Sequence, residues 1–476
     1  MKKILSLVLA LAMVLTLGIS ALAEDESRSL NEVLGSAVSA TLPMKADYTL
    51  GSEKLIDFGD HAAYGLAVKV SLEANEIIEM KFCGKNEGID TIIEIYKKNG
   101  EAFERITDIS GDNDNCNGDG EEMIFSADET RDYYITFAGY NYAETGECVL
   151  EIKSVEGKAG KPLDFTAETA PVPAAGDLWT WDAQDRVLTL KDGFDLTVVE
   201  DEPAIHLPGG ATLIVEGKAT VRGYNEDESA IECDGALIIK GSGADKSVLN
   251  IVSYDDGIYA DALLSIENIA VNIRARSEGT LSYGLSYITN AKLDVDAGNE
   301  CIYVGNDPDY GAKLGIKNSD LDLYSEGEEG IDVSGELSIT GGKLVVLADE
   351  NALEAHKMTL TDVIFDLKTI DEDYTFIDIQ EEWEGFSLPG TFRLYGIDGK
   401  QLYEGEWKDE LLNEDGELYV GGTEVFAAAS VVEEPEPEPE PKPVPEPKGD
   451  TVVIKIGAAA AEKGEANPNT GAEVVG

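Results

Sequence analysis

Pairs of acidic or amide residues recur along the middle of the chain, each directly before a small residue and an aliphatic one. If these segments stack as coils, equivalent side chains lie about 4.8 Å apart, and carboxylates at that spacing repel one another and raise one another's pKa. Ca²⁺, which accepts six to eight oxygen ligands, would neutralise them. The candidate calcium ligands of this acidic row are Asp255, Asp256, Asn299, Glu300, Glu328, Glu329, Glu350 and Asn351, with Glu228 ahead of them. The alternative is an exposed acidic turn that is only solvated.

A second set of residues follows the same step of a small and an aliphatic residue and points away from the expected core. This outward row consists of His206, Glu232, Tyr259, Ser286, Tyr303, Asp332 and Glu354. Tyrosine rings and carboxylates on a flat face can bind an extended polysaccharide by stacking and by hydrogen bonds to hydroxyls. We assign Glu232, Tyr259, Tyr303 and Asp332 as candidate carbohydrate-binding residues, and an ordinary solvated β-face as the alternative.

Repeated short strands must position both rows. Units with strict period-2 alternation begin at Ala204, Ala230, Gly257, Gly284, Cys301, Gly330 and Ala352. Each unit has a turn residue for which we expect the left-handed backbone conformation, because Gly, Asn and Asp tolerate positive φ. These turn residues are Gly217, Gly241, Asn268, Asn290, Asn318, Gly341 and Asp362. Units of three strands and tight turns predict an all-β protein built on a parallel β-helix, by default right-handed.

The other segments divide the chain further. Short strands separated by Gly- and Asp-rich turns predict an antiparallel β-sandwich over residues 46–155, followed by a linker and then the β-helix over residues 177–370. Hairpin patterns over residues 371–432 indicate a C-terminal cap, and residues 433–476 form a Pro/Glu-rich spacer and tail. Trp179 and Trp181 alternate at the start of the β-helix, where they are expected to close its open end.

The N-terminus and the net charge predict where the protein works. Residues 1–23 have two lysines, an apolar run and an Ala-Leu-Ala end, which indicates a cleaved secretory signal peptide. The formal net charge of −58 becomes −60 once Lys2 and Lys3 are removed. Such a charge excludes nucleic acid and anionic membranes as partners, and we expect no membrane insertion. The sequence therefore predicts a secreted protein that attracts divalent cations.

Two further features concern the covalent state of the chain. Five cysteines, Cys83, Cys116, Cys148, Cys233 and Cys301, have irregular spacing, so mostly free thiols are expected, with one disulfide open among the first three. Residues 467–472 resemble the sorting signal of sortase substrates, although no apolar span or basic tail follows them. Association with a cell wall or cell surface is therefore an expectation, and a flexible tail is the alternative.

Residues 46–155 resemble the bacterial pre-peptidase C-terminal type of β-sandwich. The resemblance rests on the order of four segments, Ser71–Glu76, Asp90–Tyr96, Gly111–Asn115 and Tyr133–Tyr140. Members of that family are accessory modules of secreted proteins, so the resemblance implies a non-catalytic role for this part of the chain.

Residues 177–370 resemble the secreted clostridial carbohydrate-binding domain family of β-helices, which is similar in fold to polysaccharide lyases. The matching segments are Trp179–Asp182, Val187–Leu190, Gly210–Gly217, Ile231–Gly243 and Gly330–Gly342. The resemblance implies calcium-assisted binding of an acidic, pectin-like extracellular polysaccharide. The family has no fixed metal-ligand motif, so only the acidic row is carried over to this chain.

Two other functions stay open at this point. A calcium-dependent polysaccharide lyase needs a basic residue that abstracts a proton beside the metal, and the candidates on the solenoid are Arg222, Arg274, Arg276 and Lys292. A structural surface adhesin would use the solenoid only as a stiff rod. A non-catalytic polysaccharide-binding protein is the leading hypothesis.

Overall fold

The computed structural model describes most of residues 27–431. It leaves out residues 52–54, 59–61, 86–88, 110–120, 141–142, 168–169, 309–310, 372, 381–385, 412–417 and 421–422. The predicted signal peptide, residues 1–23, and the predicted spacer and tail, residues 433–476, lie outside the described residues. Among the described residues, no helix has the length and apolar character needed to cross a membrane.

The N-terminal third of the described chain contains two β-sheets that share one core. One sheet has the order β10-β7-β12-β3 and the other β2-β6-β11-β8-β9, and Phe82 contacts Phe137 across them with ring centroids 5.7 Å apart. The strands are β2 (Val38–Ser39), β3 (Met44–Leu50), β6 (Gly65–Leu72), β7 (Ile77–Gly84), β8 (Thr91–Asn99), β9 (Ala102–Ile109), β10 (Glu121–Ser126), β11 (Arg131–Gly139) and β12 (Gly146–Ser154). A further small sheet has the order β1-β4-β5, with β1 (Arg28–Ser29), β4 (Ile56–Asp57) and β5 (Ala62–Ala63). The helix α1 (Leu30–Gly35) follows β1 directly.

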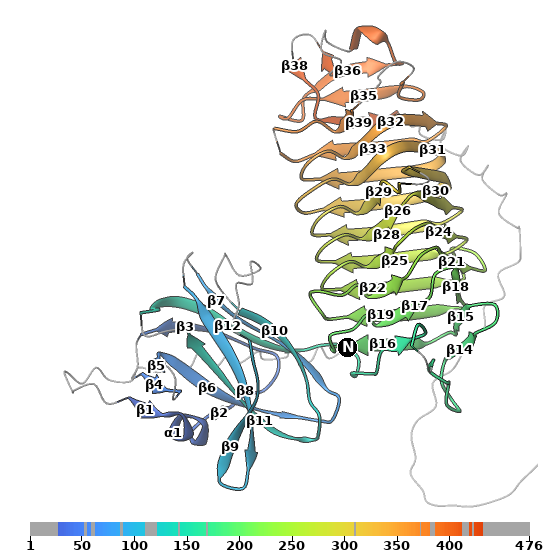
Figure 1. Cartoon of the computed structure of the whole chain (residues 1–476). Helices are drawn as coiled ribbons and strands as arrows, with labels where there is room; N and C mark the ends of the chain where they lie inside the picture. The colour runs from blue at the N-terminus through green and yellow to red at the C-terminus, as the bar shows by residue number, and fades with distance from the viewer. Residues whose placement is uncertain are drawn as a thin grey trace, which may run out of the picture. The chain divides into compact units, whose positions relative to one another are not determined.

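From β13 to β34 the chain forms a parallel β-solenoid in which three sheets run along a stack of coils (Figure 1). The first sheet contains β13 (Leu163–Asp164), β17 (Ile205–Leu207), β20 (Ile231–Cys233), β23 (Ile258–Ala260), β26 (Thr280–Tyr283), β29 (Ile302–Gly305), the start of β31 (Ile331–Ala348), the start of β32 (Leu353–Thr361) and β34 (Ile377–Ile379). The second sheet contains β15 (Val187–Leu190), β18 (Ala211–Val215), β21 (Leu237–Gly241), β24 (Leu264–Glu267), β27 (Leu285–Thr289), the start of β30 (Lys313–Ser325) and the middle of β31. The third sheet contains β16 (Phe194–Val198), β19 (Lys218–Gly223), β22 (Val248–Ser253), β25 (Ala270–Ala275), β28 (Lys292–Ala297), the ends of β30 and β31, and β33 (Ile364–Thr369).

The alternation of apolar and polar residues produces this architecture, because each strand buries one face inside the coil. Aliphatic side chains such as Ile205, Ile231 and Ile258 stack on equivalent positions of successive coils, and each is 0% exposed. Burial of the stacked rows stabilises each coil only when its neighbours are present. The predicted all-β class, with a β-helix after a β-sandwich, is confirmed.

The turn between the second and third sheets has the predicted backbone conformation in most coils. Positive φ angles between 49° and 87° occur at Gly217, Asn268, Asn290, Asn318, Gly341 and Asp362. The prediction is wrong at Gly241, which continues β21. The turn of that coil is longer, and its residue with positive φ is Gly243, at 133°.

One coil begins at a different residue from the predicted one. Thr280 pairs with Ile258 on one side and with Ile302 on the other, so Gly279 occupies the small-residue position that we assigned to Gly284. Gly284 instead forms the single-residue connection between β26 and β27, with φ 81°. The physical reason is that the connection between β26 and β27 is only one residue long. Gly284 is followed directly by Leu285, and this Gly-Leu pair has the same pattern as the small and aliphatic residues that start the other coils.

Both ends of the solenoid have antiparallel strands that close the stack. At the start, β14 (Trp179–Asp182) pairs with β15, and the buried Trp179 packs against Phe165. At the other end, β39 (Ala427–Ser430) pairs with β33 and with β35 (Phe392–Tyr395). The remaining elements of this cap are β36 (Gln401–Gly405), η2 (Asp409–Leu411), β37 (Tyr419–Val420) and β38 (Thr423–Glu424). Cys148, Cys233 and Cys301 are free and buried, whereas Cys83 is disulfide-bonded.

Substituting Gly279 by alanine is expected to destabilise the solenoid by about 1–3 kcal/mol, because overpacking strains a close-packed core. A Cβ atom at Gly279 would lie 2.3 Å from Cγ1 of Val295 and 2.5 Å from the carbonyl oxygen of Cys301. Urea unfolding measures the loss, and Gly35→Ala is the control, because a Cβ atom there meets nothing within 4 Å. Equal midpoints for the two variants would contradict the predicted clash.

Candidate functional site

The acidic row lies immediately before the first sheet and is positioned by backbone hydrogen bonds between coils. The N–H of Gly257 donates to the carbonyl of Glu278 at 2.9 Å, and the N–H of Gly279 donates to the carbonyl of Glu300 at 2.9 Å. The N–H of Cys301 donates in the same way to the carbonyl of Glu329 at 3.3 Å. The register therefore stacks one side chain per coil in the order Ser229, Asp256, Glu278, Glu300, Glu329 and Asn351.

Four consecutive members of this row are carboxylic acids, and they are removed from water. Asp256 is 5% exposed, Glu300 7% and Glu329 9%, and Glu278 is half-buried. Among the described residues, no salt bridge joins any of the four to a basic side chain. A row of this kind needs protons or metal ions, because adjacent buried carboxylates cannot all remain charged.

The pKa values follow from this crowding. Burial, followed by the hydrogen bond to Glu278, raises the pKa of Asp256, so that the pair shares a proton that resides on Asp256. Burial and then the neighbouring Glu328 raise the pKa of Glu300 to about 8. Burial and the charges of Glu354 and Glu350 raise the pKa of Glu329. Without a cation, the row is therefore partly protonated at neutral pH.

Glu300 belongs to a cluster of three neighbouring carboxylates. Carboxylate oxygens of Glu300, Glu328 and Glu329 lie within 4.8 Å of one another. The Oε2 atom of Glu300 is buried and has no hydrogen-bond partner among the described residues. An unpaired buried carboxylate oxygen is costly, and a proton or a bound cation would each remove that cost.

The other predicted ligands lie beside this row. Asp255, Asn299, Glu328 and Glu350 each precede a row member by one residue, and burial raises the pKa of Asp255. Asn299 donates to the hydroxyl of Ser277 at 3.5 Å. The structure thus brings all eight predicted ligands to one edge of the solenoid, spread over coils that start at Gly257, Cys301, Gly330 and Ala352.

Glu278 belongs to the row but was missed by the sequence analysis. The sequence pattern placed the start of this coil at Gly284, whereas the coil starts at Gly279. Glu278, the residue directly before the true start, was therefore not assigned to the acidic row. The spacing could have revealed it, because Gly257, Gly279 and Cys301 are each 22 residues apart.

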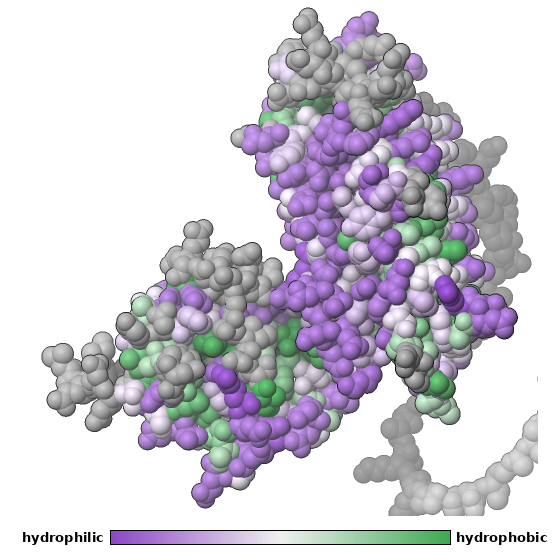
Figure 2. All heavy atoms as spheres, in the orientation of Figure 1, coloured by the Kyte–Doolittle hydropathy of each residue, from purple (hydrophilic) through white to green (hydrophobic). Residues whose placement is uncertain are grey.

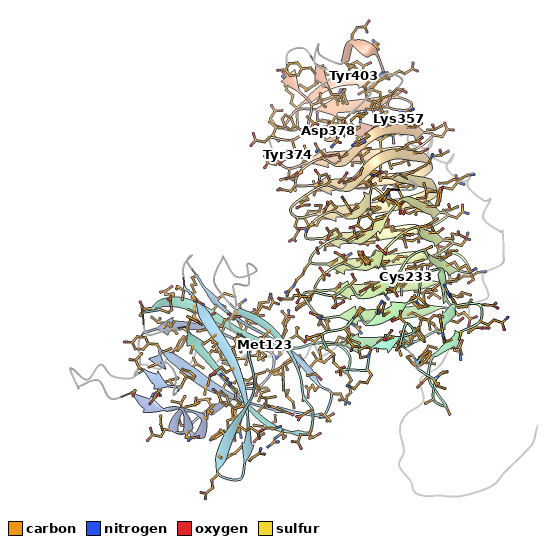
Figure 3. The ribbon with its side chains drawn as sticks, viewed as in Figure 1. Met123, Cys233, Lys357, Tyr374, Asp378 and Tyr403 are labelled. Atoms are coloured by element: carbon orange, nitrogen blue, oxygen red, sulfur yellow. The ribbon has the colours of Figure 1, made fainter. Side chains whose placement is uncertain are left out.

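The outward row is the exposed side of the first sheet. By register it contains His206, Glu232, Tyr259, Leu281, Tyr303, Asp332, Glu354 and Asp378. The assignment of Ser286 to this row is wrong, because Ser286 is 3% exposed within β27. The predicted carbohydrate-binding residues Glu232, Tyr259, Tyr303 and Asp332 all lie on the row, which extends to Asp378 on β34 (Figure 3).

The two rows meet near Asn351. The side-chain amide of Asn351 donates to Oε2 of Glu354 on the outward row at 3.0 Å and to Oε1 of Glu329 on the acidic row at 3.5 Å. Burial and then Glu354 raise the pKa of Asp332 to about 7. Ligands on the two rows would therefore influence each other electrostatically.

The viewed surface of the solenoid is largely hydrophilic (Figure 2).

A second group of possible metal ligands was also missed. The Nε2 atom of His206 lies 2.9 Å from Oδ1 of Asp234 and 3.5 Å from Oε1 of Glu232, and Nδ1 of His206 lies 3.8 Å from Oδ1 of Asp164. Only stacking of β13, β17 and β20 brings these residues together, so no local motif signals them.

The four basic residues considered for lyase chemistry all form ion pairs on or beside the third sheet. Arg222 pairs with Asp195, and Lys292 pairs with Asp245 at 3.0 Å. Arg274 pairs with Asp294 at 2.8 Å, and Arg276 pairs with Glu226 at 3.3 Å. The hydrogen bond to Asp245 raises the pKa of Lys292, which makes its ammonium a poorer source of a general base.

A family model described as carbohydrate-binding domain-containing protein matches residues 192–373. No curated protein matches the chain. Among solved structures, the chain is similar to the catalytic domain of a GH87 alpha-1,3-glucanase in complex with tetrasaccharides, at 9% identity and a TM-score of 0.18. That match covers 64% of this chain and 63% of the glucanase domain, so the chain spans less than two thirds of its length.

Proposed function

We propose that this chain is a secreted, non-catalytic protein that binds an acidic, pectin-like polysaccharide with the help of calcium. The outward row would contact the polymer, and calcium at the acidic row would order the coil edge and bridge to uronate carboxylates. The family model matched to residues 192–373 supports carbohydrate binding by the solenoid.

The observation that carries the calcium part is the stack of Asp256, Glu278, Glu300 and Glu329 with its unpartnered oxygen on Glu300. The donor set fits Ca²⁺, because the three clustered ligands are carboxylates and no thiol or imidazole belongs to the acidic row. Glu300, Glu328 and Glu329 would hold the ion.

Electrostatics supports a bridging cation. A chain with a formal net charge of −58 repels a polyuronate, so direct contact between the two is unfavourable. A bound calcium ion supplies positive charge where the acidic row meets the outward row. Asp332, Glu354 and their neighbours can then accept hydrogen bonds from sugar hydroxyls without facing an uncompensated carboxylate.

Binding to immobilised polygalacturonate is expected in calcium and is expected to fall by at least about tenfold in EDTA, a change equivalent to about 1.4 kcal/mol. Affinity electrophoresis or a plate assay measures it, with a gel or plate that lacks polymer as the control. Retention that is the same in calcium and in EDTA would overturn calcium assistance, and no retention in either would overturn pectin binding. Steady formation of an unsaturated product, followed by ultraviolet absorbance, would show lyase activity instead.

A further inference from the structure

A pocket of about 350 Å³ opens on the first sheet, separate from the acidic row. Its size falls in the range of about 300–1,000 Å³ that is typical of small-ligand sites. We call it the tyrosine pocket, and it is lined by Tyr259, Asp261, Tyr283, Asn306, Asp307 and Pro308. Only Tyr259 was singled out from the sequence.

An insertion in the solenoid builds one wall of the tyrosine pocket. The connections between the first and second sheets are residues 208–210, 234–236 and 261–263 in three earlier coils, whereas the connection after β29 spans residues 306–312. Asp307 and Gly311 exchange backbone hydrogen bonds of 3.3 Å and 2.8 Å, which hold these two residues side by side. In solenoids, such insertions often form the binding face.

The neighbouring coil is shortened at the same place, which gives the insertion room. Gly284 alone joins β26 to β27, and a Cβ atom at Gly284 would lie 3.1 Å from Cβ of Asp307. The ring of Tyr283 lies over Gly305, where a Cβ atom would lie 2.7 Å from two ring carbons. The two glycines therefore let the wall and the ring approach the backbone closely.

The lining has the chemistry of a sugar site. The rings of Tyr259 and Tyr283 are 6.3 Å apart at an interplanar angle of 70°, and the Tyr259 hydroxyl donates to Oδ1 of Asp261 at 3.4 Å. Aromatic rings contact the C–H face of a pyranose, and carboxylates accept hydrogen bonds from its hydroxyls.

The charge of the lining selects among sugars. Asp261 and Asp307 each contribute a carboxylate, and none of the six lining residues is Lys, Arg or His. An acidic sugar would therefore be repelled in the absence of a cation, whereas a neutral sugar brings hydroxyl donors and no charge.

We propose that the tyrosine pocket binds one residue of a neutral polysaccharide, so that the solenoid holds a second, cation-independent sugar subsite. This inference rests on the proposed function, because it assumes that the solenoid binds carbohydrate. It adds a ligand class, neutral glycan chains, that the acidic row does not explain.

The test is isothermal titration of the full chain in EDTA with cellohexaose, xylohexaose and mannohexaose, and with oligogalacturonate as the charged probe. We expect at least one neutral hexasaccharide to bind in EDTA and oligogalacturonate not to bind. Binding of oligogalacturonate only when calcium is added, with no neutral ligand bound, would overturn the inference and leave the proposed function standing. Neutral binding without any binding to polygalacturonate in calcium would support the inference and overturn the proposed function.

Variants locate the neutral ligand. Tyr283→Ala and Asp261→Ala are each expected to weaken binding of the neutral hexasaccharide by about tenfold or more. Tyr287→Ala is the matched control, because Tyr287 is a 38% exposed tyrosine on the second sheet, outside the tyrosine pocket. Unchanged affinity in both pocket variants would overturn the assignment, as would an equal loss in the control. Circular dichroism confirms that each variant is folded.

Discussion

Chelation of calcium is expected to lower the melting temperature of this chain by about 5–10 °C at pH 8. A ligand present at 100 times its dissociation constant stabilises the folded state by about 2.7 kcal/mol, and each kcal/mol moves the transition by about 2–4 °C in a domain of 150–250 residues. The effect should centre on Glu300, whose buried Oε2 atom has no partner among the described residues. Differential scanning calorimetry in calcium and in EDTA measures it.

The melting temperature of the variant E300Q is expected to lie above that of the wild type in EDTA and below it in calcium. In EDTA it should melt at a higher temperature, because a buried charge beside Glu328 is removed. In calcium it should melt at a lower temperature, because an amide is a weaker calcium ligand than a carboxylate. The control is E326Q, since Glu326 is exposed in the same coil.

Two results would contradict this prediction. If EDTA leaves the wild-type melting temperature unchanged, the buried acidic row is neutralised by protons and not by calcium. If E300Q and the wild type respond equally to EDTA, calcium binds elsewhere on the chain.

In EDTA, the stability of the chain is expected to fall as the pH rises from 5 to 9. Burial and neighbouring carboxylates raise the pKa of Asp256 to about 9, of Glu300 to about 8 and of Glu329 to about 9 in the folded state. The folded chain therefore retains protons that the unfolded chain releases near its ordinary carboxyl pKa of about 4. The stability is fully present below that value and is lost as the pH rises through the folded-state values.

The expected loss is at least about 3 kcal/mol in the free energy of unfolding, because each unit of pKa shift corresponds to about 1.4 kcal/mol. In calcium the profile should be much flatter, since the ion replaces the protons. Urea unfolding at each pH, followed by tryptophan fluorescence, measures both profiles, and E300Q should show a shallower slope in EDTA. Stability that increases with pH in EDTA would contradict the assigned protonation.

Much of the fold followed from local patterns. Period-2 alternation predicted inward residues such as Leu237 and Ile239, and both are 0% exposed. The turn residues Asn268, Asn290 and Asn318 were predicted to have positive φ and have values of 54°, 50° and 49°. These features depend on a residue and its nearest neighbours in the chain, so a single sequence contains the information.

Features that depend on adjacent coils were harder to predict. Two errors, the omission of Glu278 from the acidic row and the assignment of Ser286 to the outward row, have the same cause. Both arise from the one-residue connection at Gly284. A loop one residue long does not change which residues alternate, but it changes which residue lies beside which in the next coil. Pairing between strands distant in sequence decides that register, and local propensity does not encode it.

The sequence by itself thus determined that acidic residues would stack at one edge of a β-solenoid, because a repeated position becomes a row once coils are parallel. Only the tertiary structure decided that Asp256, Glu278, Glu300 and Glu329 are consecutive, and that one oxygen of Glu300 is buried without a partner among the described residues. It also decided that an insertion after β29 would face Tyr259 and Tyr283 from earlier coils. Burial and proximity between coils, on which both proposals rest, are properties of the packed stack.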